Sequence, residues 1–223
     1  MKNLKMFFVL VVAMLATAMT FTACTDDNDD KALDANAQKQ YMTMMSGSYT
    51  GKMRMYYADM SKQKYVQYDS LQTMWQVRSD STLTISSFPV SSLDSCINVP
   101  KGEISSEATQ LRELQQAIGK IKNPIQLQAY YYIPVSSFIS NDYISFFVNP
   151  VFFKQTLNYN GADHDVYFVF LTNSYGGNFD RTGRLFEYHM YLQSVSIDKK
   201  PVDYSNSVSA RYFRNLLITC YSK

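Results

Sequence analysis

Apolar and polar side chains alternate along several short stretches of this chain. In the first of them, Thr50, Lys52 and Arg54 separate the apolar side chains of Tyr49, Met53, Met55 and Tyr57. Successive side chains of a β-strand point to opposite faces, so this pattern predicts strands with one face on a core. Similar runs follow at 66–68, 73–77, 82–86, 125–135, 143–153, 165–172, 185–197 and 211–221.

The composition agrees with a mainly β protein. The chain has 18 tyrosines and 14 phenylalanines but one tryptophan, and aromatic residues favour the half-buried surface of a sheet. With about 8–10 short strands, the expected fold is an antiparallel barrel or sandwich.

Two segments have the period of a helix instead. Apolar residues recur at helical spacing over 32–45, and again over 105–119, where Ser105 or Ser106 can cap the start and Gly119 can end the helix. We therefore expect one short helix before the strands and one between them.

Local signals add detail to the strands. Asn160-Gly161 predicts a tight hairpin, and the glycine-rich segment 173–183 predicts a longer turn. Both faces of 166–171 are apolar, which predicts a strand covered on both sides. In 185–197 the alternation of apolar residues slips, because Leu192 and Val195 fall on opposite faces, and a β-bulge near Gln193-Ser194 would reconcile the two halves of that strand.

The amino terminus has the features of an export signal. Lys2 and Lys5 precede an apolar run from Met6 to Ala18, which is shorter than the about 20 residues that a membrane-spanning helix needs. Thr22-Ala23-Cys24 resembles the lipobox of bacterial lipoproteins, although Phe21 stands where leucine is usual. That resemblance implies cleavage before Cys24 and acylation of this cysteine with palmitate-type chains. An ordinary cleaved signal with an incidental cysteine is the alternative.

Four aspartates follow the proposed lipidation site at positions 26, 27, 29 and 30. Like charges at this density extend a chain, which indicates a tether. An EF-hand loop is excluded, because its glycine and glutamate positions hold Lys31 and Ala37. The acidic run resembles the export signal of Bacteroidetes surface lipoproteins, which implies the outer face of the outer membrane. The expected organisation is a signal peptide at 1–23, a lipidated tether at 24–31 and one β-rich domain at 32–223.

The charge balance narrows the range of partners. Removal of residues 1–23 takes away two of the 21 basic residues and none of the 19 acidic ones, so the two signs then balance. Nucleic-acid binding calls for a basic surface, and we expect no nucleic-acid partner. The expected partners are the membrane, through the lipid anchor, and a glycan, lipid or envelope protein.

Two further cysteines, Cys96 and Cys220, remain besides Cys24. In an exported protein they can form a disulfide, or they can be two buried free thiols. The spacing leaves both alternatives open.

The residues from "MSGSYTGKMRMYY" to "TMWQVRSDSTLTISSFP", together with the lipobox, tether and short helix, resemble an uncharacterised family of Bacteroidetes lipoproteins. Such families resemble calycins, the lipocalin-like barrels, in which a glycine-x-aromatic first strand follows a short helix. Gly47-Ser48-Tyr49 fits this element, with tyrosine in place of the usual tryptophan. The helix at 105–119 departs from a plain calycin barrel. The resemblance implies no activity and transfers no functional residue.

The histidines are the first candidates for chemistry. His164 lies beside Asp163 and Asp165, and His189 shares a strand face with Glu187. A metal site of a hydrolase would need Asp163, His164, Glu187 and His189 to meet, but turn and strand-edge positions explain these residues equally well. The sequence contains neither a Gly-x-Ser-x-Gly motif nor a P-loop. We therefore expect no catalytic activity, no metal site and no cofactor.

Clustered aromatics give the better indication of function. Adjacent tyrosines place rings on both faces of their strands, and the face turned away from the core could bind a ligand. The candidates are Tyr56, Tyr57, Tyr130, Tyr131 and Tyr132. The expected function is a non-catalytic binding module, and the alternative is a structural subunit of an outer-membrane complex. Coverage by a second layer would make these rings ordinary core residues.

Overall fold

The computed structural model describes residues 32–59, 62–135, 138–172, 176–199 and 207–223. Residues Ala32–Lys223 form one compact unit. Among the described residues, no helix is long and apolar enough to span a membrane. The predicted signal peptide, Cys24 and the acidic tether lie outside the described residues.

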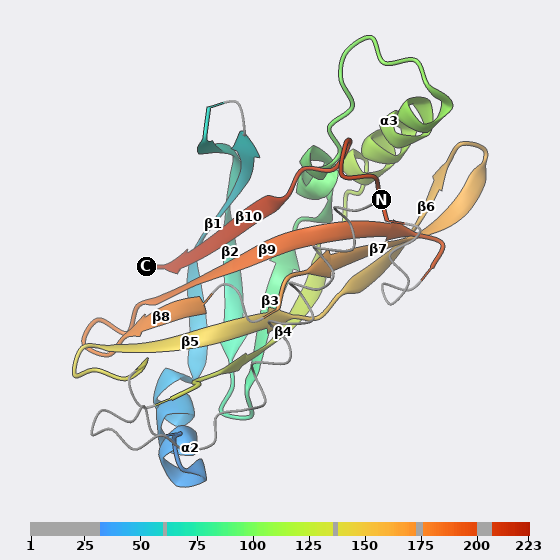
Figure 1. The fold of residues 1–223 in the computed structure, drawn as a ribbon. Coiled ribbons are helices and arrows are strands. Elements are labelled where there is room, and N and C mark those ends of the chain that lie inside the picture. Colours follow the sequence, from blue (N-terminus) through green and yellow to red (C-terminus); the bar gives the residue numbers. More distant parts are fainter. Residues whose placement is uncertain (1–31, 60–61, 136–137, 173–175, 200–206) are drawn as a thin grey trace, which may run out of the picture. The chain divides into compact units, whose positions relative to one another are not determined.

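The core of this unit is a closed antiparallel barrel of eight strands (Figure 1). Around the barrel the strands follow the order β10-β1-β2-β3-β4-β5-β8-β9, and pairing between β9 and β10 closes the ring. The strands are β1 (Gly47–Asp59), β2 (Lys64–Val77), β3 (Thr82–Phe88), β4 (Ile125–Tyr132), β5 (Tyr143–Pro150), β8 (Gly176–Asp180), β9 (Phe186–Ile197) and β10 (Leu216–Ser222). The predicted fold class is confirmed.

Two more strands continue the sheet beyond the ring. β6 (Phe153–Tyr159) and β7 (Ala162–Phe170) form a hairpin, and β7 pairs with the carboxyl-terminal half of β9. The amino-terminal half of β9 pairs with both β8 and β10. The hairpin turn has φ values of 52° at Asn160 and 78° at Gly161. Two successive positive values are what a type I′ turn requires, so the predicted hairpin is confirmed.

In the part of the chain that the structure describes, three helices accompany the strands. α2 (Ala35–Met45) is capped by the Asp34 side chain and leads directly into β1. The 3₁₀ helix η1 (Val90–Cys96) follows Pro89 at the end of β3. α3 (Ser106–Gly119) starts at Ser105, whose hydroxyl accepts a hydrogen bond from the amide of Ala108 at 3.2 Å. Both α-helices lie where the periodicity predicts them.

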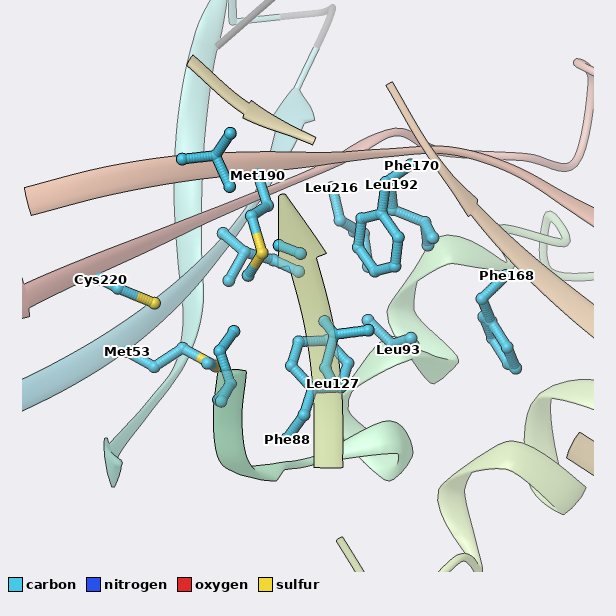
Figure 2. Packing of buried hydrophobic residues seen from close by; sticks show 14 of the residues in the cluster. Met53, Phe88, Leu93, Leu127, Phe168, Phe170, Met190, Leu192, Leu216 and Cys220 are labelled. Atoms are coloured by element: carbon cyan, nitrogen blue, oxygen red, sulfur yellow. The ribbon is translucent and has the colours of Figure 1, made fainter. Parts of the chain in front are cut away.

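The inward faces of the strands build one hydrophobic core. Toward α2 it is aromatic: the rings of Trp75 and Tyr188 meet edge-on at 5.4 Å, and Phe146 and Phe186 lie 4.7 Å apart. Figure 2 shows another part of the core, where methionine, leucine and phenylalanine side chains of several strands pack together with Leu93 of η1. The labelled residues there include Met53, Met190, Leu192 and Leu216, all 1% exposed or less.

The irregularity predicted in the strand 185–197 is a β-bulge. Val169 pairs with Ser194 and Phe170 with Leu192, so Gln193 has no partner of its own on β7. Leu192 and Val195 are both fully buried although they are three residues apart.

The glycine-rich turn predicted at 173–183 is wrong in part, because Gly176–Asp180 form β8. A Cβ atom at Gly177 would lie 2.4 Å from the Phe146 ring, so glycine is what lets β8 cross that ring closely.

Candidate functional site

A groove of about 450 Å³ lies at the end of β1 that is remote from α2. Gly47, which follows α2, and Tyr57, in the groove, are ten residues apart on this strand, or about 33 Å in an extended strand. The lining comes from four separate parts of the chain: Tyr57, Ala58, Asp59, Asn98, Tyr191, Ala210, Arg211, Phe213, Arg214 and Asn215. This volume is in the range of small-molecule binding sites.

Strand geometry turns Tyr57 toward the interior side of the barrel. Met53 and Met55 point inward and are fully buried, and Tyr57 continues their parity. The register between β1 and β2 shifts between Met55 and Tyr56, where β2 has one extra residue, Tyr68. The rings of Tyr57 and Tyr68 lie 5.9 Å apart. Tyr57 is therefore an inward-facing residue just past the closed core.

Backbone contacts with η1 fix the opposite wall of the groove. Ile97, directly after η1, forms an antiparallel bridge with Phe213. The amide of Asn98 donates to the carbonyl of Tyr212 at 2.7 Å, and the amide of Arg214 donates to the carbonyl of Cys96 at 2.7 Å. These bonds hold Arg211, Phe213 and Arg214 against the end of the barrel.

The Arg214 side chain lies over the Tyr57 ring. Its Cζ atom is 4.3 Å from the ring centroid, and its Nη2 donates a hydrogen bond to Oδ1 of Asn98. A guanidinium on an aromatic face gains a cation–π attraction. Arg214 is therefore held between a ring and an amide from two other parts of the chain.

The other two charged residues of the groove have ionic partners. Arg211 forms an ion pair with Glu103 at 2.6 Å, and Asp59 forms one with Lys62 at 3.3 Å. On the remaining wall, burial raises the pKa of Tyr191; Tyr65 adds to this effect, and a hydrogen bond with Asn215 opposes it. Tyr191 is therefore a neutral phenol at physiological pH.

Only one of the five tyrosines predicted to bind a ligand lines this groove. Tyr57 does so, whereas Tyr56 lies on the outer parity of β1 and Tyr130 is a 50% exposed residue of β4. Tyr132 stacks on Phe147 at 5.3 Å. Tyr131 is 1% exposed and donates a hydrogen bond to the carbonyl of Arg78 at 2.7 Å, so the structure places it in the core and not in the groove.

The structure separates the two histidines. Nδ1 of His164 lies 2.8 Å from Oδ2 of Asp198, and Nε2 of His189 lies 3.5 Å from Oε1 of Glu187. His164 precedes Val166, which pairs with Ile197, whereas His189 is eight residues earlier on β9, or about 26 Å along the strand. No group of three metal-ligating side chains occurs within the described ranges. The site that the hydrolase alternative needs is therefore not assembled there.

Cys96 and Cys220 are free and buried. Burial raises the pKa of both thiols, that of Cys220 to about 12. Of the two alternatives left open by the sequence, the structure has the free thiols and not the disulfide. Cys96 lies in η1 whereas Cys220 lies on β10 beside the Tyr188 phenol, so each thiol fills its own place in the core.

Sequence patterns did not identify Asn98, Arg211 or Arg214 as site residues. Arg211 and Arg214 fall in the segment 211–221 that was predicted as a strand, but the strand there begins only at Leu216. Asn98 lies outside the strands, and the bridge between Ile97 and Phe213 that unites the three residues joins positions more than a hundred residues apart. The one local signal in the groove was the Tyr56-Tyr57 pair.

Comparison with known proteins gives a family and a distant structural match. A family model described as a domain of unknown function (DUF4840) matches residues 44–197. Among solved structures, the crystal structure of the ywiB protein from Bacillus subtilis matches with a TM-score of 0.28 and 6% sequence identity, covering 83% of this chain and 98% of that chain. No curated protein matches the chain.

Proposed function

This chain belongs to the DUF4840 family, and we propose that it is a non-catalytic binding module that a lipid on Cys24 holds at the outer membrane of a bacterium. Its ligand is a carbohydrate that enters the groove beside Tyr57. The amino-terminal pattern supports the anchor: Lys2 and Lys5, an apolar run, and Cys24 before the acidic tether.

The observation that carries the binding role is the composition of the groove. Three aromatic side chains, of Tyr57, Tyr191 and Phe213, share it with the amides of Asn98 and Asn215. Amide groups both donate and accept hydrogen bonds, as sugar hydroxyls do. Aromatic rings offer apolar faces for the C–H surface of a sugar ring. This mixture suits a hydroxyl-rich ligand better than a lipid tail.

The alternative is a structural subunit of an outer-membrane complex, which would present an apolar patch to its partner. The exposed large apolar side chains of the described residues come from separate segments: Tyr65 lies on β2, Tyr130 on β4, and Phe152 in the link between β5 and β6. The groove therefore supports the binding role more directly than the surface supports the alternative.

The test is binding of the full-length lipoprotein, purified in detergent, to an array of neutral and acidic oligosaccharides. We expect binding that Tyr57→Ala weakens at least tenfold, because this change removes a wall of the groove and the support of Arg214. Tyr130→Ala is the matched control, since Tyr130 is an exposed tyrosine outside the groove. A silent array, or equal binding by both variants, would overturn the proposal.

A further inference from the structure

The charges of the groove do not cancel. Its lining has three charged side chains, those of Asp59, Arg211 and Arg214. Lys62 neutralises Asp59 at 3.3 Å, and Glu103 neutralises Arg211 at 2.6 Å. Arg214 forms no ion pair with any carboxylate of the described residues; its polar side-chain contact is the neutral amide of Asn98. Among the described residues, one positive charge of the groove, that of Arg214, therefore remains without a carboxylate partner.

This charge is also held in place. The Tyr57 ring supports the guanidinium at 4.3 Å, Asn98 accepts from Nη2, and the backbone amide of the same arginine is bonded to Cys96. A guanidinium has five N–H donors in a fixed fork that matches a carboxylate or sulfate group, and Asn98 takes one of them. An ordered fork loses less conformational entropy on binding than a mobile surface arginine.

We infer that the ligand is an anionic sugar, whose negatively charged group is bound by the guanidinium of Arg214. This inference rests on the proposed function and specifies its ligand. Uronic acids and sulfated sugars both fit this description, because each has an oxyanion, planar in a carboxylate and tetrahedral in a sulfate, on a hydroxylated ring. The rings and amides of the groove contact the ring of the sugar, and Arg214 selects for the charge.

The experiment compares three probes by calorimetric titration of the full-length protein in detergent: oligogalacturonate, its uncharged methyl ester, and a sulfated oligosaccharide from chondroitin. We expect at least one of the two anionic probes to bind ten- to a hundredfold more tightly than the methyl ester, as is typical of a charge-assisted, bidentate contact. Added salt should weaken that binding and leave binding of the methyl ester nearly unchanged.

Three variants connect the preference to Arg214. Arg214→Gln should bring the affinity for the anionic probe to that for the methyl ester, and Arg214→Lys should recover part of the difference, because lysine keeps the charge without the fork. Arg54→Gln is the matched control: Arg54 also lies over a ring, that of Tyr221 at 5.4 Å, but outside the groove. It should leave all affinities unchanged.

The outcomes separate this inference from the function on which it rests. If the methyl ester binds as tightly as both anionic probes, or if Arg214→Gln weakens charged and uncharged probes equally, the inference is wrong while the groove remains a sugar site. If only the sulfated probe shows the preference, the inference holds and the oxyanion is a sulfate. If no probe binds and the broader array is also silent, the proposed function fails together with it.

Discussion

At the scale of single residues, Gly51 shows how close the strands come at the seam between β1 and β10. A Cβ atom at this position would lie 1.8 Å from the backbone carbonyl oxygen of Tyr221. Backbone atoms of a paired strand cannot move aside without breaking the ladder, so any side chain here must displace β10. The glycine is a condition for closing the barrel.

We therefore expect Gly51→Ala to lower the free energy of unfolding by about 3 kcal/mol, the upper range of overpacking effects. Gly47→Ala on the same strand is the control, because a Cβ atom there meets the Tyr49 ring at an ordinary 3.6 Å. It should change stability by about 0.5 kcal/mol or less. Urea denaturation followed by tryptophan fluorescence measures both, and similar losses for the two variants would contradict the close approach.

We expect His189 to make the stability of the fold depend on pH. Burial lowers its pKa from the usual value, and Glu187 partly opposes this. The unfolded chain therefore takes up this proton at a higher pH than the folded one, so stability is complete above the unfolded pKa of about 6.5 and decreases as the pH falls.

His189→Gln should reduce the loss of melting temperature between pH 7.5 and pH 5, because glutamine has no proton to take up. Glu187→Gln should enlarge that loss, since it removes the group that raises the pKa of His189. Thermal unfolding at several pH values measures both slopes. Parallel curves for wild type and His189→Gln would show that another group controls the acid sensitivity.

At the scale of elements, the bulge in β9 reconciles two buried faces of one strand. Gln193 is exposed and is the extra residue of the bulge. Without it, Leu192 and Ser194 would be neighbours in the chain, as are their partners Phe170 and Val169 on β7. Val195 would stay on the inner face. Removal of His189 from the same strand would instead move the residues on one side of it to the wrong face.

We expect deletion of Gln193 to give a folded protein, less stable by about 1–3 kcal/mol because the strand loses its bend. Deletion of His189 should give an unfolded or insoluble product, since a one-residue slip exposes buried side chains such as Met190 and Leu192. Far-ultraviolet circular dichroism of the two variants reports whether their strands form, and near-ultraviolet circular dichroism reports whether their aromatic side chains are packed. Equal damage from both deletions would show that Gln193 is not an independent bulge residue.

The sequence was informative about elements because strand periodicity is local. The alternation of apolar and polar residues predicted most of the strands, and the Asn160-Gly161 pair predicted a hairpin. The break in alternation after Leu192 predicted the bulge. The sequence did not predict β8, because two adjacent glycines, Gly176 and Gly177, are typical of a turn. In the structure these glycines let the strand pass close to Phe146. That requirement comes from a neighbouring strand and leaves no local pattern.

The groove was less predictable than the strands for the same reason. Tyr57, Asn98, Tyr191 and Arg214 belong to four distant parts of the chain, and barrel closure brings them together. Adjacent tyrosines drew attention to Tyr57 but equally to Tyr131, because composition does not distinguish a ring in the core from a ring at a groove. The alternation along β4 holds the missing signal, because Tyr131 lies two and four residues after the apolar Ala129 and Leu127 and so shares their buried face.

At the scale of the whole molecule, the proposals combine a binding domain with a lipid anchor. An anchor raises the local concentration of the groove at the cell envelope, so a modest affinity for a sugar can suffice. Several acyl chains are needed for this, because a single chain binds membranes only marginally. A lipoprotein cysteine with both thioether and amide-linked chains meets that requirement.

Cys24→Ser should abolish incorporation of labelled palmitate and move the protein from the detergent phase to the aqueous phase of a phase-separation assay. The control keeps the cysteine and replaces Asp26 and Asp27 with asparagine. This variant should remain lipidated, whereas its digestion by protease added to intact cells should decrease, because the acidic run is proposed to direct export. If Cys24→Ser still takes up palmitate, the anchor is not at this cysteine. If the asparagine variant is digested as readily as the wild type, the aspartates serve only as a spacer, and the surface location must come from elsewhere in the chain.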